Sequence, residues 1–208
     1  MILTQTLIDE TIDKLMIEGL SPTLVRLGFK SYKRKFQKTV GKFKLELNVQ
    51  LRKITGQNAG YVSVYPGIIY DELNNLVAEL VGVKPRKGWS IAGGNIGNLQ
   101  PEGEFIEWPV TDTTDVIALG ELICGYIHDY GVPFWEDFSS ISGLVAGYER
   151  EDPRVTLIGN YCYKLQMVAA YCILGNKEKA KRVLEKWDQG RPQQKVLELA
   201  IQKISMMD

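Results

Sequence analysis

The chain has a single histidine, His128, and only three cysteines among its 208 residues. One histidine excludes a second catalytic centre built on this residue type. Cys124, Cys162 and Cys172 lack the Cys-x-x-Cys spacing of zinc and redox sites. We therefore expect no cofactor, and we expect the cysteines to be buried free thiols in a reducing compartment.

Long apolar runs are also missing. The best run, residues 116–127, is interrupted by Glu121 and is too short to span a bilayer. The first ten residues contain two carboxylates, Asp9 and Glu10, and no basic residue, which is not the pattern of a signal peptide. These features predict a cytoplasmic protein that does not bind membranes.

Charge is balanced overall but strongly segregated along the chain. Residues 21–60 hold ten Lys and Arg and one carboxylate, Glu46, whereas residues 61–152 hold four basic and fifteen acidic residues. Segregated charge affects partners and association rates rather than the fold. The basic block is therefore the first candidate for a binding surface.

Hydrophobic periodicity predicts helices followed by strands. Apolar residues recur at helical spacing as far as Gly28, and Ser21-Pro22 has the pattern of a helix start. Strict alternation over residues 43–51 then predicts a strand. Further strands are expected at 32–37, at 61–65 ending at Pro66-Gly67, and at 105–108 stopped by Pro109. The short connections require antiparallel pairing.

The rest of the chain is predicted to be mainly helical, apart from a loop at 85–103. The expected helices are 71–81, Thr113 or Thr114 to His128, Ser139 or Ser140 to Tyr148, 153–174, 176–187 and 191–204. Small residues on both sides of Leu174-Gly175-Asn176 (Ala169, Ala170 and Ala180) suggest a single tetratricopeptide-like hairpin.

This order of elements predicts an α+β fold. It would have an N-terminal helix, an antiparallel β-meander of three to five strands and a C-terminal helical bundle. We expect a helix-and-sheet region at 1–112 and a helical region at 113–208, packed together as one compact unit.

The basic strands supply the main candidate site. Alternation places Lys42, Lys44 and Arg52 on one face with two amides, Asn48 and Gln50. Arg34 joins this set from the preceding predicted strand. Such a face can be simply solvated, with Lys protecting a sheet edge. It can also dock an acidic protein, or the basic strands 30–53 can bind the phosphates of a nucleic acid.

Cys124 and His128 are the secondary candidates, for catalysis. They lie four residues apart on one predicted helix, so both side chains can point the same way. Such a pair can form a thiolate nucleophile or half of a metal site. The same pattern fits a small core residue beside a histidine at a helix end. Because zinc needs three or four protein ligands, we predict no metal.

Three other features are weaker candidates for a functional site. The carboxylates of residues 102–115 have no fixed spacing and are expected to form a solvated acidic surface. The glycine-rich stretch 93–98 is not a phosphate-binding loop, because no Gly-Lys-Ser/Thr follows it. Tyr161, Tyr163 and Trp187 on the C-terminal helices could anchor a peptide.

Several short motifs resemble the DUF4304 family of uncharacterised bacterial proteins. They are the stretches 24–30 (LVRLGFK), 34–36 (RKF), 47–50 (LNVQ), 132–134 (VPF) and 174–176 (LGN) with Ala180. The resemblance implies an α+β cytosolic protein and brings no known activity or catalytic residue.

These observations lead to one main functional hypothesis. Separated charge without a complete catalytic constellation favours a non-enzymatic binding protein that docks a charged sheet face onto a protein partner. An immunity protein, which neutralises a bacterial toxin domain, is the expected type, by analogy of fold and charge alone. A nucleic-acid-binding module and an enzyme dependent on Cys124 and His128 are the alternatives.

Overall fold

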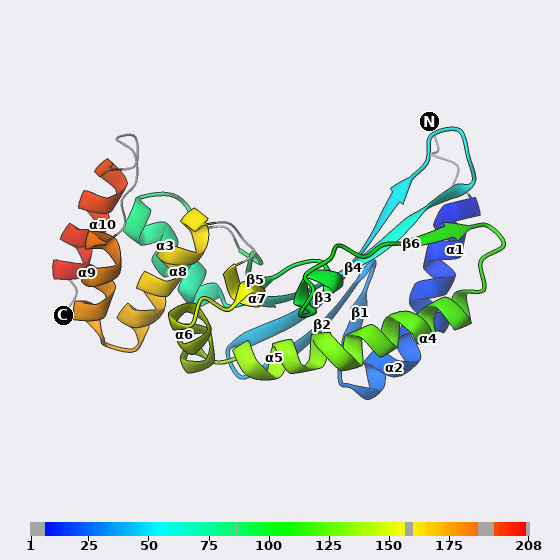
Figure 1. Cartoon of the computed structure of the whole chain (residues 1–208), viewed down its shortest axis with the longest axis horizontal. Coiled ribbons are helices and arrows are strands. Elements are labelled where there is room, and N and C mark those ends of the chain that lie inside the picture. The colour runs from blue at the N-terminus through cyan, green and yellow to red at the C-terminus, as the bar shows by residue number, and fades with distance from the viewer. Residues whose placement is uncertain (1–6, 86, 157–159, 187–193, 207–208) are drawn as a thin grey trace. The chain divides into compact units, whose positions relative to one another are not determined.

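A computed structural model confirms the α+β class (Figure 1). It describes residues 7–85, 87–156, 160–186 and 194–206, without the side chains of 160–163 and 194–197. Six strands form one sheet in the order β1-β2-β3-β4-β5, with β6 paired to β4. Their bounds are β1 Lys30–Tyr32, β2 Lys35–Val40, β3 Phe43–Lys53, β4 Ala59–Ile69, β5 Ser90–Gly93 and β6 Trp108–Thr111.

The chain divides into two compact units, each of which is described by itself. Unit 1 comprises residues 1–40, 44–67 and 94–136, and unit 2 comprises 41–43, 68–93 and 137–208. The expected boundary at 112/113 stays a prediction. The helical elements of unit 1 are α1 Leu7–Lys14, η1 Leu15–Leu20, α2 Ser21–Arg26, η2 Ile96–Leu99, α4 Val116–Tyr126, η3 Ile127–Gly131 and most of α5 Val132–Phe138.

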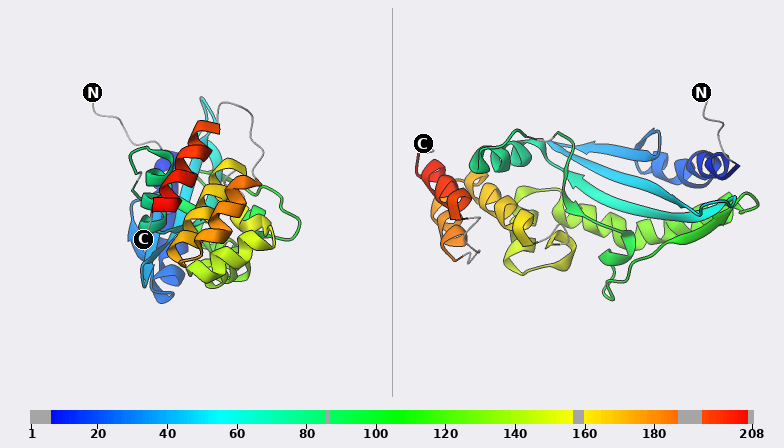
Figure 2. Two further views of the ribbon diagram at one scale, coloured as in Figure 1. Left: turned by 90° about the vertical axis from the view of Figure 1, so that its left-hand side faces the viewer. Right: turned by 90° about the horizontal axis from the view of Figure 1, so that it is seen from above.

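Unit 2 contains most of the C-terminal helices. They are α6 Ile141–Glu149, α7 Pro153–Thr156, α8 Asn160–Ile173, α9 Lys177–Glu185 and α10 Gln194–Met206, and the unit also contains α3 Asp71–Val81. Figures 1 and 2 show α3, α8, α9 and α10 side by side, in agreement with their mutual contacts. Ala169, Ala170 and Ala180 are fully buried, so the small residues let α8 and α9 pack closely. Asn176 caps α9, as expected, by accepting a hydrogen bond from Lys179 N.

The predicted strand at 32–37 is wrong. These residues instead form a hairpin, in which β1 pairs with β2 through Ser31↔Phe36 and Tyr32↔Lys35. The two-residue turn between the strands is Lys33-Arg34, and Lys33 has a φ of 54°. A left-handed lysine is uncommon, and neither glycine nor asparagine marks the turn. The alternation therefore looked like one continuous strand.

Proline did not end the strands where the sequence predicted. β4 continues through Pro66-Gly67 to Ile69, and β6 includes Pro109 opposite Tyr61. The neighbours of β4 use its carbonyl oxygens, which a proline still offers: Gly94 N donates to Pro66 O. β6 pairs with β4 alone in the described sheet, and an edge strand tolerates proline because its outer N–H needs no partner.

The predicted helix ends also need correction. Ser21 does not cap a helix: α1, η1 and α2 follow one another directly, and Leu20 holds the cap position of α2 without a side-chain bond. Gly28, with a φ of 85°, ends this segment as expected. Asp115, rather than Thr113 or Thr114, caps α4 by accepting from Ile117 N and Ala118 N.

The helix beginning at α4 does not stop at His128. It passes through the π-helical segment η3 into α5, which contains Pro133. A proline within a helix removes one N–H donor, and a wider turn is one way to accommodate that loss. Ser140 then caps α6, as predicted, by accepting from Gly143 N. The predicted helix 153–174 is found as α7 and α8, and Arg191, Pro192 and Trp187 lie outside the described residues.

The predicted loop 85–103 contains β5 and the 3-10 turn η2. Asn95 is 2% exposed and fixes this turn, because its Oδ1 accepts from Gly97 N and Ile106 N while its Nδ2 donates to Ile106 O. A side chain on Gly97 would overlap the carbonyl oxygen of Glu104. Gly97 is therefore required for close packing of this turn.

In the core of unit 1, the helical segments η1 and α4 cross at close range. A Cβ on Gly19 would lie 2.5 Å from Val116 O, and a Cβ on Gly120 would overlap the Cα of Gly19. The two backbones can therefore approach without intervening side chains. Apolar residues of the strands join the same core, including Phe36, Leu47, Val49, Val62 and Val64. Within the described residues, no helix is long and apolar enough to cross a membrane.

The glycine crossing gives a direct test. Gly120→Ala should destabilise the protein by about 2–4 kcal/mol, because the new methyl group forces the two backbones apart. Gly125→Ala, on the same helix with no atom within 4 Å of the added Cβ, should be neutral or stabilising by up to about 1 kcal/mol. Urea denaturation measures both. Equal effects of the two substitutions would contradict the close crossing.

Candidate functional site

The basic block lies beside carboxylates from other parts of the chain. In unit 1, Asp9 of α1 accepts from Arg34 at 2.8 Å and also from Lys53, and Glu107 accepts from Arg52. In unit 2, Lys42 lies 2.8 Å from Glu72. The separation of charge along the sequence is therefore partly cancelled within the folded units.

Glu46, the one carboxylate of the basic block, lies on the polar face of the sheet. It is 7% exposed and accepts from Gln37 Nε2 at 2.8 Å and from Lys35 Nζ at 3.3 Å. Alternation along β3 places Lys44, Asn48 and Gln50 on the same face. The predicted shared face thus exists, and it carries a neutralised carboxylate at its centre.

Two of the six predicted binding residues are not part of this face. Arg34 is in the Lys33-Arg34 turn, where its carbonyl accepts from Val49 N and its guanidinium binds Asp9. Lys42 lies in the turn before β3 and belongs to unit 2. Lys44, Asn48, Gln50 and Arg52 are in β3 as predicted.

Lys42 is part of a small polar cluster in unit 2. Glu72 accepts from Lys42 Nζ and also from the Tyr70 hydroxyl at 2.6 Å. Burial, reinforced by the hydrogen bond to Glu72, raises the pKa of Tyr70 to about 12. The lysine itself is 74% exposed, so the pair contributes about 0–1 kcal/mol.

The β1–β2 hairpin carries three cations of the basic block that no carboxylate of the described residues neutralises. Within the described residues, none of the ion pairs of the basic block includes Lys30, Lys33 or Lys38, whereas Arg34, Lys35 and Arg52 each have one. Tyr32, which is 66% exposed, lies among them in sequence. The sequence contained these lysines within the basic block but gave no reason to prefer them, because the ion pairs that neutralise their neighbours join distant segments.

Two grooves meet at this hairpin. The larger, about 790 Å³, is lined by Asp13, Met16, Ile17, Ser31, Tyr32, Lys33, Arg34, Lys35 and Asn48. The smaller, about 590 Å³, is lined by Gly28, Lys30, Ser31, Tyr32, Gln37, Lys38 and Thr39. Both share Ser31 and Tyr32. We call this surface the hairpin site and define it by Lys30, Ser31, Tyr32, Lys33 and Lys38.

Cys124 and His128 have different surroundings. Cys124 is buried, and burial raises the pKa of its thiol, which a hydrogen bond with Thr23 and the charge of Arg26 only partly offset. A raised pKa is the opposite of what an activated nucleophile needs. The His128 ring is 82% exposed and contacts Asp129 at 2.9 Å. Cys172 is half-buried, and the Cys162 side chain lies outside the described residues.

The remaining predicted features are not assembled into a site. Within the described residues, no three His, Cys, Asp or Glu side chains are placed to hold a metal ion. Glu102, Glu104, Asp112 and Asp115 are exposed, as expected for a solvated surface. The side chains of Tyr161, Tyr163 and Trp187 lie outside the described residues.

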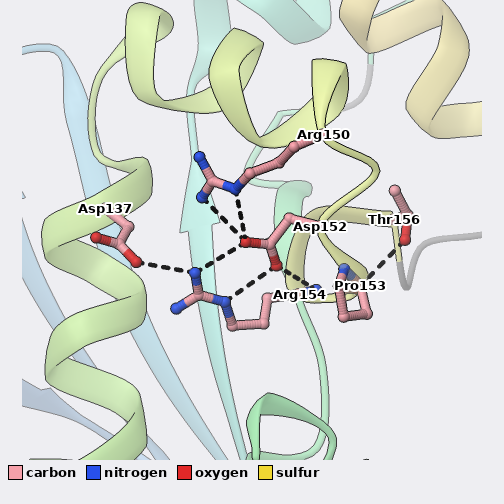
Figure 3. Close-up of polar contacts among 6 residues, drawn as sticks. All are labelled: Asp137, Arg150, Asp152, Pro153, Arg154 and Thr156. Atoms are coloured by element: carbon pink, nitrogen blue, oxygen red, sulfur yellow. Dashed lines mark hydrogen bonds and ion pairs between the residues drawn. The ribbon is translucent and has the colours of Figure 1, made fainter. Parts of the chain in front are cut away.

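A separate charged cluster in unit 2 surrounds Asp152, which is 8% exposed (Figure 3). Its carboxylate accepts from Arg154 Nη2 at 2.9 Å, from Arg154 N at 3.0 Å and from Arg150 Nη2 at 3.0 Å. Arg154 also reaches Asp137 at 2.9 Å and lies 4.8 Å above the ring of Phe138. Because these groups satisfy one another, the cluster connects α6, α7 and α5 and leaves little capacity for a ligand.

The Asp152 cluster predicts a pH-dependent stability. Burial alone would raise the pKa of Asp152, but the hydrogen bonds from Arg154 and Arg150 outweigh it and lower the pKa below the usual range. The stabilisation is therefore complete above the unfolded value of about 3.9 and is lost as pH falls through the lower folded value. Asp152→Asn should cost about 1–3 kcal/mol at pH 7 and progressively less in acid.

Asp137→Asn is the matched control, because Asp137 is 47% exposed and its pair with Arg154 contributes about 0–1 kcal/mol. Urea denaturation from pH 7 down to pH 3 compares the two variants with the parent chain. A cost of Asp152→Asn that does not change with pH would contradict the assigned role.

Comparison with protein-family models finds no match to this chain, and comparisons with curated proteins and with solved structures find no significant match. The resemblance to the DUF4304 family therefore stays a prediction. The hairpin site and the polar face of β3 are the two candidate binding surfaces of the described residues.

Proposed function

We propose that the chain is a non-enzymatic binding protein that docks onto an acidic surface of another protein. The observation that carries this proposal is the gathering of free cations on the hairpin site. Cations that no neighbouring carboxylate neutralises attract an acidic partner and accelerate its association. Exposed Tyr32 supplies the amphipathic aromatic group that is common at the centre of protein interfaces.

A nucleic-acid-binding module is the second candidate, and two observations make it less favoured. Several cations of the basic strands already pair with carboxylates, among them Arg52 with Glu107 and Lys35 with Glu46. Tyr61, on β4, has the Arg52 guanidinium 4.4 Å above its ring, so that face is occupied rather than free to stack on a base. A phosphate track would need a longer row of unpaired cations.

The finer proposal concerns the kind of partner. We propose an immunity-type role, in which the chain occupies a toxin domain in the cytoplasm and blocks it. The support is an analogy of fold class and charge with small bacterial immunity proteins, together with an exposed recognition surface. Free Cys124 and Cys172 are compatible with a reducing compartment. An enzyme that uses Cys124 and His128 has no support from their geometry.

Charge reversal tests the proposal. The triple variant Lys30→Glu, Lys33→Glu and Lys38→Glu should lower the association rate with the partner by about tenfold or more at low salt, because it replaces attraction with repulsion. Its association should also become less sensitive to salt. The partner is first captured from a lysate of the native cells on the parent chain, and association rates are then measured by surface plasmon resonance.

The matched control is Lys84→Glu, Lys87→Glu and Lys181→Glu, which changes the net charge equally at positions in unit 2. This control should change the rate by less than about threefold. Equal binding by the hairpin variant and the parent chain would remove the hairpin site as the docking surface. Captured material that nuclease releases would instead favour the nucleic-acid candidate.

A further inference from the structure

Strand β1 is an open edge of the sheet. It is the first strand in the order β1-β2-β3-β4-β5, and all three of its residues are exposed. Paired residues in an antiparallel hairpin alternate between hydrogen-bonded and non-hydrogen-bonded pairs. In a two-residue hairpin the pair next to the turn, here Tyr32 and Lys35, is the bonded one. The N–H and C=O of Ser31 therefore point away from β2.

The outward backbone groups of Ser31 lie where the two grooves of the hairpin site meet. Ser31 and Tyr32 line both grooves, so a chain that runs along β1 would contact both. Among the described residues, no backbone group of a turn, loop or helix cap forms a hydrogen bond with the backbone of Ser31. Lys30 and Lys38 line one groove and Lys33 the other. An added strand would thus have lysines on both sides, and the Asp13 carboxylate at the larger groove.

The charge of the edge selects the occupant. A second copy of this chain would bring its own Lys30, Lys33 and Lys38 against the same lysines, and like charges at that spacing repel. An extended segment with carboxylates at alternate positions would place them beside these lysines while its backbone bonds to Ser31. Edge lysines commonly prevent pairing with neutral strands, and they do so without excluding an acidic one.

We propose that the β1 edge binds an extended acidic segment of the protein partner as an added β-strand. This inference rests on the proposed function and specifies how the hairpin site recognises its partner. Backbone bonds at Ser31 set the position of the added strand, and the three lysines select its charge.

The test uses peptides selected from a random 12-residue library displayed on phage, with the full chain as bait. The selected peptides should be rich in Asp and Glu. Ser31→Pro removes the outward N–H and should weaken their binding by about fivefold or more, whereas Ser31→Ala keeps the N–H and should bind normally. The lysine triple variant should also lose binding.

A second measurement does not depend on how the variants fold. Methylating single backbone nitrogens of a selected peptide should weaken binding strongly at the one position whose N–H donates to Ser31 C=O, and little at the other positions, because Ser31 alone turns its backbone groups outward on β1. A uniform effect along the peptide, selected peptides without acidic residues, or no selected peptide at all would overturn the inference. Normal binding to Ser31→Pro would do the same.

Failure of this inference can be distinguished from failure of the proposed function. A native partner that is lost with the lysine triple variant but binds Ser31→Pro normally would preserve docking at the hairpin site and overturn strand addition. Edge-to-edge pairing of two copies, seen as a dimer that Ser31→Pro abolishes, would likewise overturn the acidic-segment assignment.

Discussion

The contact between Gly19 and Gly120 is the constraint on which unit 1 depends. Two helical segments can approach this closely only where both lack a side chain, and here η1 and α4 meet backbone to backbone. The apolar face of the sheet, from Phe36 to Val64, then packs into the same core. The polar face of β3 is left outward as a consequence. The hairpin site lies at the β1 edge of the same sheet.

The fold class could be predicted from the sequence because hydrophobic periodicity is a property of each single helix or strand. The alternation over 43–51 predicted the central strand β3, and the small residues beside Gly175 predicted the contact between α8 and α9. Features that depend on distant partners could not be predicted. The Lys33-Arg34 turn uses a left-handed lysine, and Pro109 is tolerated only because β6 lies at an edge.

The candidate site shows the same division between local and distant information. Asn48, Gln50, Lys44 and Arg52 were correctly placed on one strand, since strand alternation is a local rule. Which lysines remain free depends on the ion pairs of their neighbours, and Asp9 and Glu107 come from segments far away in sequence. Charge segregation indicated the region that carries the proposed site, but only the fold separates neutralised cations from available ones.

The π-helical segment η3 has a consequence for how chain length can vary. A π turn holds one residue more than an α turn, so it can absorb an inserted residue while the helix on either side keeps its faces. Beyond η3, Trp135 still donates from Nε1 to Gly67 O at 3.1 Å and packs on the ring of Phe29. Relatives of this chain could therefore be one residue shorter at 127–131 and keep this anchor. The lone His128 lies within this stretch of adjustable length.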